Sequence, residues 1–220
     1  MTRRAEISKN LIDVQERIQA AAKKSGRNHE EIHLIVVTKN FPVSDVEILK
    51  ELGVNDFGEN RDSDAAAKAA LVSGTWHFQG QIQSNKLKSI CSWAQVIHSL
   101  DDLRHFEIIE KSAVHPLEIF LQVNLDGSAN RGGASIENLY RLAAKVQDDP
   151  VHRLAGIMAV APLTIAAERA FEQLRAIHTA FTVDFPNAKK LSAGMSSDFE
   201  LAIAYGATHL RIGSQIMGSR

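Results

Sequence analysis

Hydrophobic positions in the first fifty residues alternate between two spacings. The first apolar stripe falls at spacings of four, three and four residues, as on one face of a helix: Ile7, Leu11, Val14 and Ile18. We expect this helix to end before Gly26. The run at 34–38 is short and rich in β-branched residues, which indicates a buried strand. Helical spacing returns after Pro42, and Gly53 follows it as a candidate C-cap.

The same alternation continues to the end of the chain. Strands are predicted at 34–38, 54–57, 75–78, 96–98, 118–124, 153–159, 190–193 and 208–212. Helices are predicted between them at 61–72, 85–92, 103–112, 136–147, 166–181 and 198–205. Thr164 is the expected N-cap of helix 166–181.

Strands that alternate with helices favour right-handed crossovers and a parallel sheet. Eight such strands within 220 residues predict a small (β/α)8 TIM barrel. An open doubly wound sheet would usually carry a GxGxxG turn after its first strand, and the segment Thr38–Pro42 has no such pattern. Because there is no linker, composition break or repeat, we expect residues 1–220 to form a single domain.

Composition narrows the class of protein. The chain has 25 Lys and Arg against 26 Asp and Glu, a formal net charge of −1, which does not favour nucleic acid as a partner. The single cysteine, Cys91, excludes an intramolecular disulfide and any CxxC site. The first residues are charged and lack the apolar stretch of a signal peptide, and no apolar run reaches membrane-spanning length. We therefore expect a cytoplasmic protein with no membrane partner.

In such a barrel the functional groups lie at the C-terminal ends of the strands. Lys39 follows the first strand and places an amine at the mouth of an apolar interior. Desolvation there would lower the pKa of the lysine and leave a neutral amine able to attack a carbonyl. Most lysines at strand ends simply reach solvent, so position alone leaves both interpretations open.

The segment after strand 190–193 resembles the start of a helix. Ser197 and Glu200 match the S-x-x-E capping box, and Gly194 allows the backbone to bend towards a ligand. Ser196 then has its hydroxyl free beside exposed amides, which favours an anion. A helix cap without any ligand is the simpler alternative.

The last strand offers a second group for the same anion. By alternation, Arg211 points with His209 into the barrel, and Gly213 and Ser214 follow it directly. A buried guanidinium needs an acceptor, so an internal ion pair with a carboxylate is the structural alternative. The nine histidines show no metal-binding spacing, and we interpret His77 and His98 as structural or surface residues, with no metal site.

Several motifs together resemble the pyridoxal-phosphate homeostasis proteins, single-domain relatives of the alanine racemase barrel. These motifs are Val37-Thr-Lys39, Asp56-Phe-Gly-Glu-Asn60, Trp76-His-Phe-Gln-Gly80, Gln83-Ser-Asn-Lys86, Gln122-Val-Asn124, Gly156-Ile-Met158, Gly194-Met-Ser-Ser-Asp198 and Arg211-Ile-Gly213. The resemblance implies a fold-type III barrel that binds pyridoxal 5′-phosphate (PLP, a vitamin B6 form). By it, Lys39 forms the Schiff base, and Ser196, Gly213 and Ser214 hold the phosphate. Arg211 faces the pyridine nitrogen, and Asn60 and Met158 line the ring.

The first hypothesis from this resemblance is that the protein carries PLP in vitamin B6 homeostasis. PLP-dependent apoenzymes are the candidate recipients of the cofactor. We expect the protein to be a monomer or a weak dimer. A guanidinium beside the pyridine nitrogen disfavours its protonation and weakens the electron sink. Related racemases take a second base from an additional C-terminal domain, which we do not expect beyond Arg220. Tyr140 and Tyr205, the only tyrosines, fall inside predicted helices, so we expect neither to act as the second base.

Two alternatives remain open from the sequence. The first is an amino-acid racemase-like enzyme of the same fold, which borrows its second base from a partner subunit or a loop. The second is a phosphate-binding barrel enzyme that uses no aldehyde cofactor.

Overall fold

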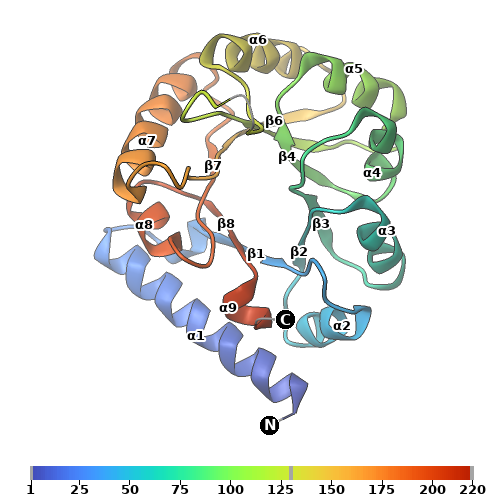
Figure 1. The fold of residues 1–220 in the computed structure, drawn as a ribbon, viewed down its shortest axis with the longest axis vertical. Helices are drawn as coiled ribbons and strands as arrows, with labels where there is room; N and C mark the ends of the chain where they lie inside the picture. Colours follow the sequence, from blue (N-terminus) through green and yellow to red (C-terminus); the bar gives the residue numbers. More distant parts are fainter. Residues whose placement is uncertain (1, 129–130, 219–220) are drawn as a thin grey trace.

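Parallel strands close into a barrel in the computed structural model, which describes residues 2–128 and 131–218. Within these residues, eight strands follow one another around the barrel in sequence order, and β8 pairs with β1 (Figure 1). They are β1 (His33–Val37), β2 (Asp56–Glu59), β3 (Thr75–Phe78), β4 (Val96–Leu100), β5 (Glu118–Gln122), β6 (Arg153–Met158), β7 (Lys190–Ser192) and β8 (His209–Ile212). The predicted (β/α)8 barrel is confirmed. Met1 and Arg220, the ends of the expected domain, lie outside the described residues.

A ring of helices surrounds the barrel (Figure 1). They are α1 (Arg3–Lys24), α2 (Val43–Glu51), α3 (Asp62–Leu71), α4 (Leu87–Trp93), α5 (Leu103–Ser112), α6 (Ile136–Gln147), α7 (Ala167–Asp184), α8 (Phe199–Ala204) and α9 (Ser214–Met217), with 3-10 turns η1 (His29–Glu31) and η2 (Ser84–Lys86). The turn η1 and the short helix α9 were not predicted from the sequence, and the helix predicted at 85–92 is divided between η2 and α4. Among the described residues, no helix combines the length and the apolar character that crossing a membrane requires.

Helix α1 begins after Thr2, whose hydroxyl accepts from the Ala5 amide at 3.3 Å. Its predicted apolar stripe is buried against the ring of helices, where α1 packs on α2, α8 and α9 (Figure 1). Arg3 fixes its start by donating to the Asp45 carboxylate on α2 at 2.8 Å and to the Met217 carbonyl on α9 at 2.8 Å. The first helix therefore joins the two ends of the barrel sequence.

The two faces of β8 separate as the alternation predicts. Leu210 and Ile212 belong to the large core between the strands and the helices, whereas His209 and Arg211 point into the barrel. A small apolar cluster inside the barrel contains Val96, Phe120, Ala155 and Met158. The lumen is thus filled partly by apolar and partly by polar side chains.

The N-cap of α7 and the start of β2 differ from their predictions. The N-cap residue of α7 is Ala166, two residues after Thr164, and the Thr164 hydroxyl instead lies 3.5 Å from the Asp126 carboxylate. Strand β2 begins at Asp56, two residues later than predicted, because the amide of Val54 bonds back to the Leu49 carbonyl at 3.0 Å and closes the end of α2.

Candidate functional site

A cavity of about 410 Å³ opens at the C-terminal end of the barrel. All seven residues singled out from the sequence line it: Lys39, Asn60, Met158, Ser196, Arg211, Gly213 and Ser214. They follow or end β1, β2, β6, β7 and β8, which meet only in the closed barrel. The sequence reasoning missed further lining residues, namely Val37, Gln79, Val160, Met195 and Ser197. Their signal was their place at or just beyond a strand end.

Lys39 stands on a turn beyond the end of β1. The Phe41 amide donates to the Thr38 carbonyl at 3.1 Å, and Asn40 takes a positive φ of 65°. Asparagine tolerates this left-handed conformation better than most residues do. The turn leaves Lys39 exposed, which agrees with the interpretation that its side chain reaches solvent and not with that of a desolvated amine.

A buried ion pair supports this turn from below. Lys68 of α3 donates to the Glu59 carboxylate at 2.6 Å and to the Thr38 carbonyl at 2.8 Å. The Thr38 hydroxyl donates to the same carboxylate oxygen at 2.7 Å. All three side chains are buried, and they hold the residue next to Lys39. The sequence reasoning did not identify this cluster.

Arg211 is buried at the inner wall of the cavity, with 5 % of its surface exposed. Its guanidinium donates to the Ser192 hydroxyl at 2.6 Å and to the Ala159 carbonyl at 3.0 Å. Both acceptors are uncharged, unlike the carboxylate considered from the sequence. Burial lowers the pKa of Arg211 to about 10, so the group is cationic at neutral pH.

The segment that contains Ser196 differs from the predicted capping box. The N-cap of α8 is Asp198, and its carboxylate accepts from the Met195 amide at 2.6 Å. Glu200 accepts from Arg17 of α1 at 2.8 Å. The capping box is therefore wrong, because a tertiary ion pair recruits its glutamate. Ser196 and Ser197 both line the cavity.

Gly194 and Gly213 lie close to other parts of the chain. Gly194 has a φ of +93°, and a Cβ there would lie 2.7 Å from the Ala202 Cβ of α8, so its freedom serves helix packing rather than a ligand. A Cβ on Gly213 would lie 3.2 Å from both the Cβ and the carbonyl of Val37. The backbone after β8 therefore lies directly against the end of β1.

Two acceptors at the cavity are unsatisfied. Asn60 Oδ1 and Gln79 Oε1 are buried and have no hydrogen-bond partner among the described residues. Buried polar atoms in native proteins are nearly always paired. The cavity is therefore suited to a ligand that brings polar groups to these atoms, in addition to groups that suit Lys39 and Arg211.

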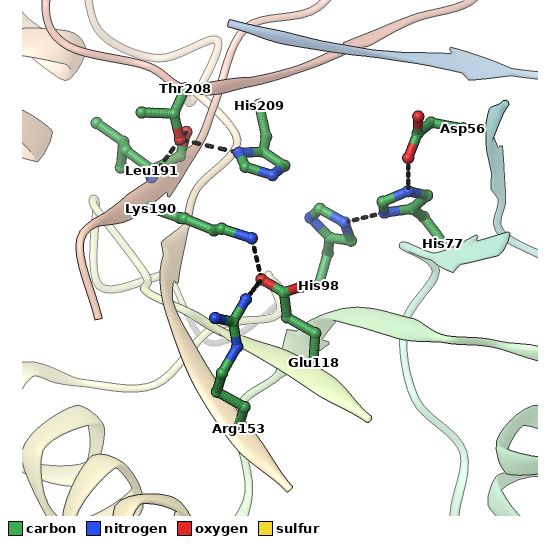
Figure 2. Close-up of polar contacts among 9 residues, drawn as sticks. All are labelled: Asp56, His77, His98, Glu118, Arg153, Lys190, Leu191, Thr208 and His209. Atoms are coloured by element: carbon green, nitrogen blue, oxygen red, sulfur yellow. Dashed lines mark hydrogen bonds and ion pairs between the residues drawn. The ribbon is translucent and has the colours of Figure 1, made fainter. Parts of the chain in front are cut away.

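His77 and His98 were interpreted as structural or surface residues. They lie in the barrel lumen, which agrees with a structural role and excludes the surface. They are 4 % and 0 % exposed, and their rings share a hydrogen bond between His77 Nδ1 and His98 Nε2 at 2.9 Å (Figure 2). His98 also stacks on Phe120, with ring centres 4.5 Å apart. Inward alternation on β3 and β4 was the signal that could have placed them.

Comparison with known proteins agrees with this geometry. The family model described as alanine racemase, N-terminal domain, matches residues 10–220. The pyridoxal phosphate homeostasis protein of Mycobacterium leprae is 35 % identical over 240 residues, covering 98 % of this chain and 93 % of that protein. The protein of the same name from Corynebacterium glutamicum is 37 % identical over 218 residues, covering 94 % and 99 %.

A solved structure supports the same assignment. PipY of Synechococcus elongatus, solved with PLP bound, superposes with a TM-score of 0.83 at 29 % identity, covering 96 % of this chain and 100 % of PipY. The chain belongs to the family of pyridoxal phosphate homeostasis proteins, which share the barrel of the alanine racemase N-terminal domain.

Proposed function

We propose that this protein binds PLP in the cavity at the C-terminal end of the barrel and takes part in intracellular PLP homeostasis, with residues 1–220 acting as one domain. The observation that carries the proposal is the meeting of one exposed amine, one buried guanidinium and three serines around a single cavity. PipY, which aligns with this chain over nearly the full length of both proteins, has PLP bound. Bound here, PLP would supply a reactive aldehyde and an electron-withdrawing ring.

Lys39 is the proposed point of attachment. Its Nζ, in the neutral form, would hold PLP by condensing with the aldehyde and releasing water. The ion pair of Lys68 and Glu59 holds the Thr38 carbonyl and so fixes the turn that presents the amine. An exposed amine is accessible to a cofactor that arrives from solution and leaves again.

The remaining lining residues bind different parts of the cofactor. Ser196 and Ser214, with the backbone at Gly213, hold the phosphate, since hydroxyls and amides are good donors to an anion. Arg211 faces the pyridine nitrogen, and Asn60 and Met158 line the ring. The unpaired oxygen of Asn60 accepts from a polar substituent of the ring.

A carrier without turnover fits this site better than a racemase does. Arg211 is cationic and buried, and a second positive charge on the adjacent ring nitrogen would be repelled. The ring would then be a weaker electron sink. Racemases of this fold tolerate that but need a second acid/base group, and neither Tyr140 nor Tyr205 lines the cavity. We further propose that the protein is cytoplasmic, that it is a monomer or weak dimer, and that PLP-dependent apoenzymes receive the cofactor.

A titration with PLP tests the proposal. The protein should develop a long-wavelength absorbance band with one equivalent bound, and Lys39→Ala should abolish the band. Lys88→Ala is the matched control, because Lys88 is exposed on α4 and lies away from the cavity. A band that survives in Lys39→Ala, or no band in the parent protein, contradicts the proposal.

Two further assays separate a carrier from an enzyme. Amino acids incubated with the loaded protein in D₂O should keep their α-protons, whereas rapid exchange would favour a racemase. The loaded protein should also restore activity to a PLP-dependent apoenzyme, and failure to do so would exclude a role in delivery.

A further inference from the structure

A continuous set of hydrogen bonds crosses the barrel lumen and ends at Arg211. It joins Asp56, His77, His98, Ser192 and Arg211, here called the lumen chain. His77 Nε2 lies 3.0 Å from Asp56 Oδ1, and His98 Nδ1 lies 2.8 Å from the Ser192 hydroxyl. The links between the rings and from Arg211 to Ser192 are 2.9 and 2.6 Å long. Figure 2 shows the Asp56 end of the lumen chain, with His77 between the carboxylate and His98.

The lumen chain connects opposite ends of the barrel. Asp56 is the first residue of β2, so it stands at the N-terminal end of the strands, and its side chain is 39 % exposed. Arg211 is the third residue of β8 and lines the cavity at the other end. A group in contact with solvent on one side of the molecule is therefore linked to the cavity on the other.

The types of donor and acceptor set the direction of these bonds. A carboxylate only accepts, so His77 carries its proton on Nε2 and donates to Asp56. With one proton on the ring, His77 Nδ1 accepts from His98 Nε2, and His98 Nδ1 then accepts from the Ser192 hydroxyl. The Ser192 oxygen keeps only lone pairs for Arg211, which donates to it. Every hydrogen thus points from Arg211 towards Asp56.

Burial and the charges around His98 favour a neutral ring that carries a single proton. Burial holds the pKa of His98 well below its usual value, and His77, Arg211, His209 and Lys190 lower it further. The Glu118 carboxylate lies at the N-terminal end of β5, and it is paired with Lys190 and Arg153 (Figure 2). Phe120 covers one face of the His98 ring and contributes no charge.

We propose that Asp56, His77 and His98 are positioning residues, which orient the Ser192 hydroxyl as an acceptor and so hold Arg211 against the ring of the bound cofactor. The cofactor part of this inference rests on the proposed function, whereas the direction of the lumen chain does not. If Asp56 is removed, His77 loses the partner that fixes its proton on Nε2. The ring bonds can then reverse, and Ser192 becomes a poorer acceptor for Arg211.

Nitrogen-15 NMR of histidine-labelled, ligand-free protein tests the direction. In the parent protein, His77 and His98 should each be protonated on Nε2 and bare on Nδ1. Asp56→Ala should mix the two tautomers of His98, whereas Asp56→Asn should preserve them because an amide oxygen still accepts from His77. A proton on His98 Nδ1 in the parent, or no change in Asp56→Ala, overturns the proposal.

Titration of the same variants with PLP tests the positioning. Asp56→Ala should weaken PLP affinity about fivefold and shift the absorbance band, since one hydrogen bond of Arg211 is compromised. Asp56→Asn should rescue both properties. Arg153→Gln is the matched control, because Arg153 lies at the same rim, bonds to Glu118 and is outside the lumen chain. Unchanged affinity and absorbance in Asp56→Ala would overturn the positioning role.

The two measurements fail separately. If the parent protein binds no PLP, the proposed function is wrong, and the tautomers in the ligand-free spectra still decide the direction of the lumen chain. If PLP binds and Asp56→Ala merely unfolds more easily, with its tautomers and absorbance band unchanged, the residues are structural and the proposal is wrong.

Discussion

The guanidinium of Arg211 donates to the hydroxyl of Ser192 over 2.6 Å. A buried arginine usually pairs with a carboxylate. Here its bonded acceptors are a hydroxyl and the Ala159 carbonyl, so its positive charge is not neutralised by direct contact. A cation of this kind at the cavity wall discourages a second cation on the ligand and favours a neutral ring nitrogen.

Replacement of Arg211 should therefore affect both affinity and absorbance. Arg211→Gln should weaken PLP binding about 10- to 100-fold, the equivalent of a hydrogen bond to a charged group, and shift the absorbance band. Arg175→Gln, on the exposed side of α7, should do neither. An unchanged spectrum and Kd for Arg211→Gln would show that the residue does not face the ring.

Ser196 should distinguish the phosphorylated cofactor from the free aldehyde. Ser196→Ala should weaken PLP binding about fivefold through loss of one hydrogen bond, and leave pyridoxal binding unchanged. Paired titrations with PLP and pyridoxal measure the difference. Ser92→Ala, at an exposed position of α4, provides the control. Equal losses for both ligands would argue against a phosphate contact.

The buried pair beneath Lys39 should be important for stability. Lys68→Met leaves the Glu59 carboxylate buried without its cation and should lower the free energy of unfolding by about 3–5 kcal/mol. The double variant Lys68→Met/Glu59→Gln should recover part of this loss. Lys145→Met breaks an exposed pair with Glu110 and should have little effect in the same urea titration. Similar losses for Lys68→Met and Lys145→Met would contradict the assignment.

Buried histidines should make the protein sensitive to mild acid. Burial lowers the pKa of His209 from 6.5 to about 2 and lowers that of His98 well below 6.5. As pH falls through 6.5, the unfolded chain takes up these protons and the folded protein does not, so stability decreases. Each histidine contributes a slope of about 1.4 kcal/mol per pH unit below this value.

Urea unfolding at pH values between 7.5 and 5.0 measures this slope. Stability should be nearly level above pH 7 and fall steadily below pH 6. His29→Gln, at an exposed position, serves as the control and should keep the slope. A free energy of unfolding that stays constant over this range would show that the lumen histidines are protonated in the folded state.

The barrel and the inward direction of Arg211 could be predicted because both follow from local periodicity. Strand and helix spacing is repeated along the chain, and alternation on β8 separates Arg211 from Leu210 and Ile212. Recognition of the family through short motifs then identified residues that the structure places around one cavity. These features depend on residues close together in the sequence.

The remaining features depend on contacts between distant segments. Glu200 matches a capping box by spacing, yet Arg17, far away in sequence, takes its carboxylate. The lumen chain joins residues from five strands, and no local pattern tells which side chains meet across a lumen. The exposure of Lys39 likewise follows from the Thr38–Phe41 turn. Strand β1 ends at Val37, so Lys39 lies on this turn and not in the strand.

Reduction of the PLP-loaded protein with borohydride, followed by peptide mass mapping, shows whether Lys39 holds the cofactor. Reduction converts the C=N bond to a stable C–N bond and marks the lysine that held the cofactor. We expect one pyridoxyl label per chain, on the peptide that contains Lys39, and none in Lys39→Ala. A label on another lysine, or no label after loading with excess PLP, would contradict this expectation.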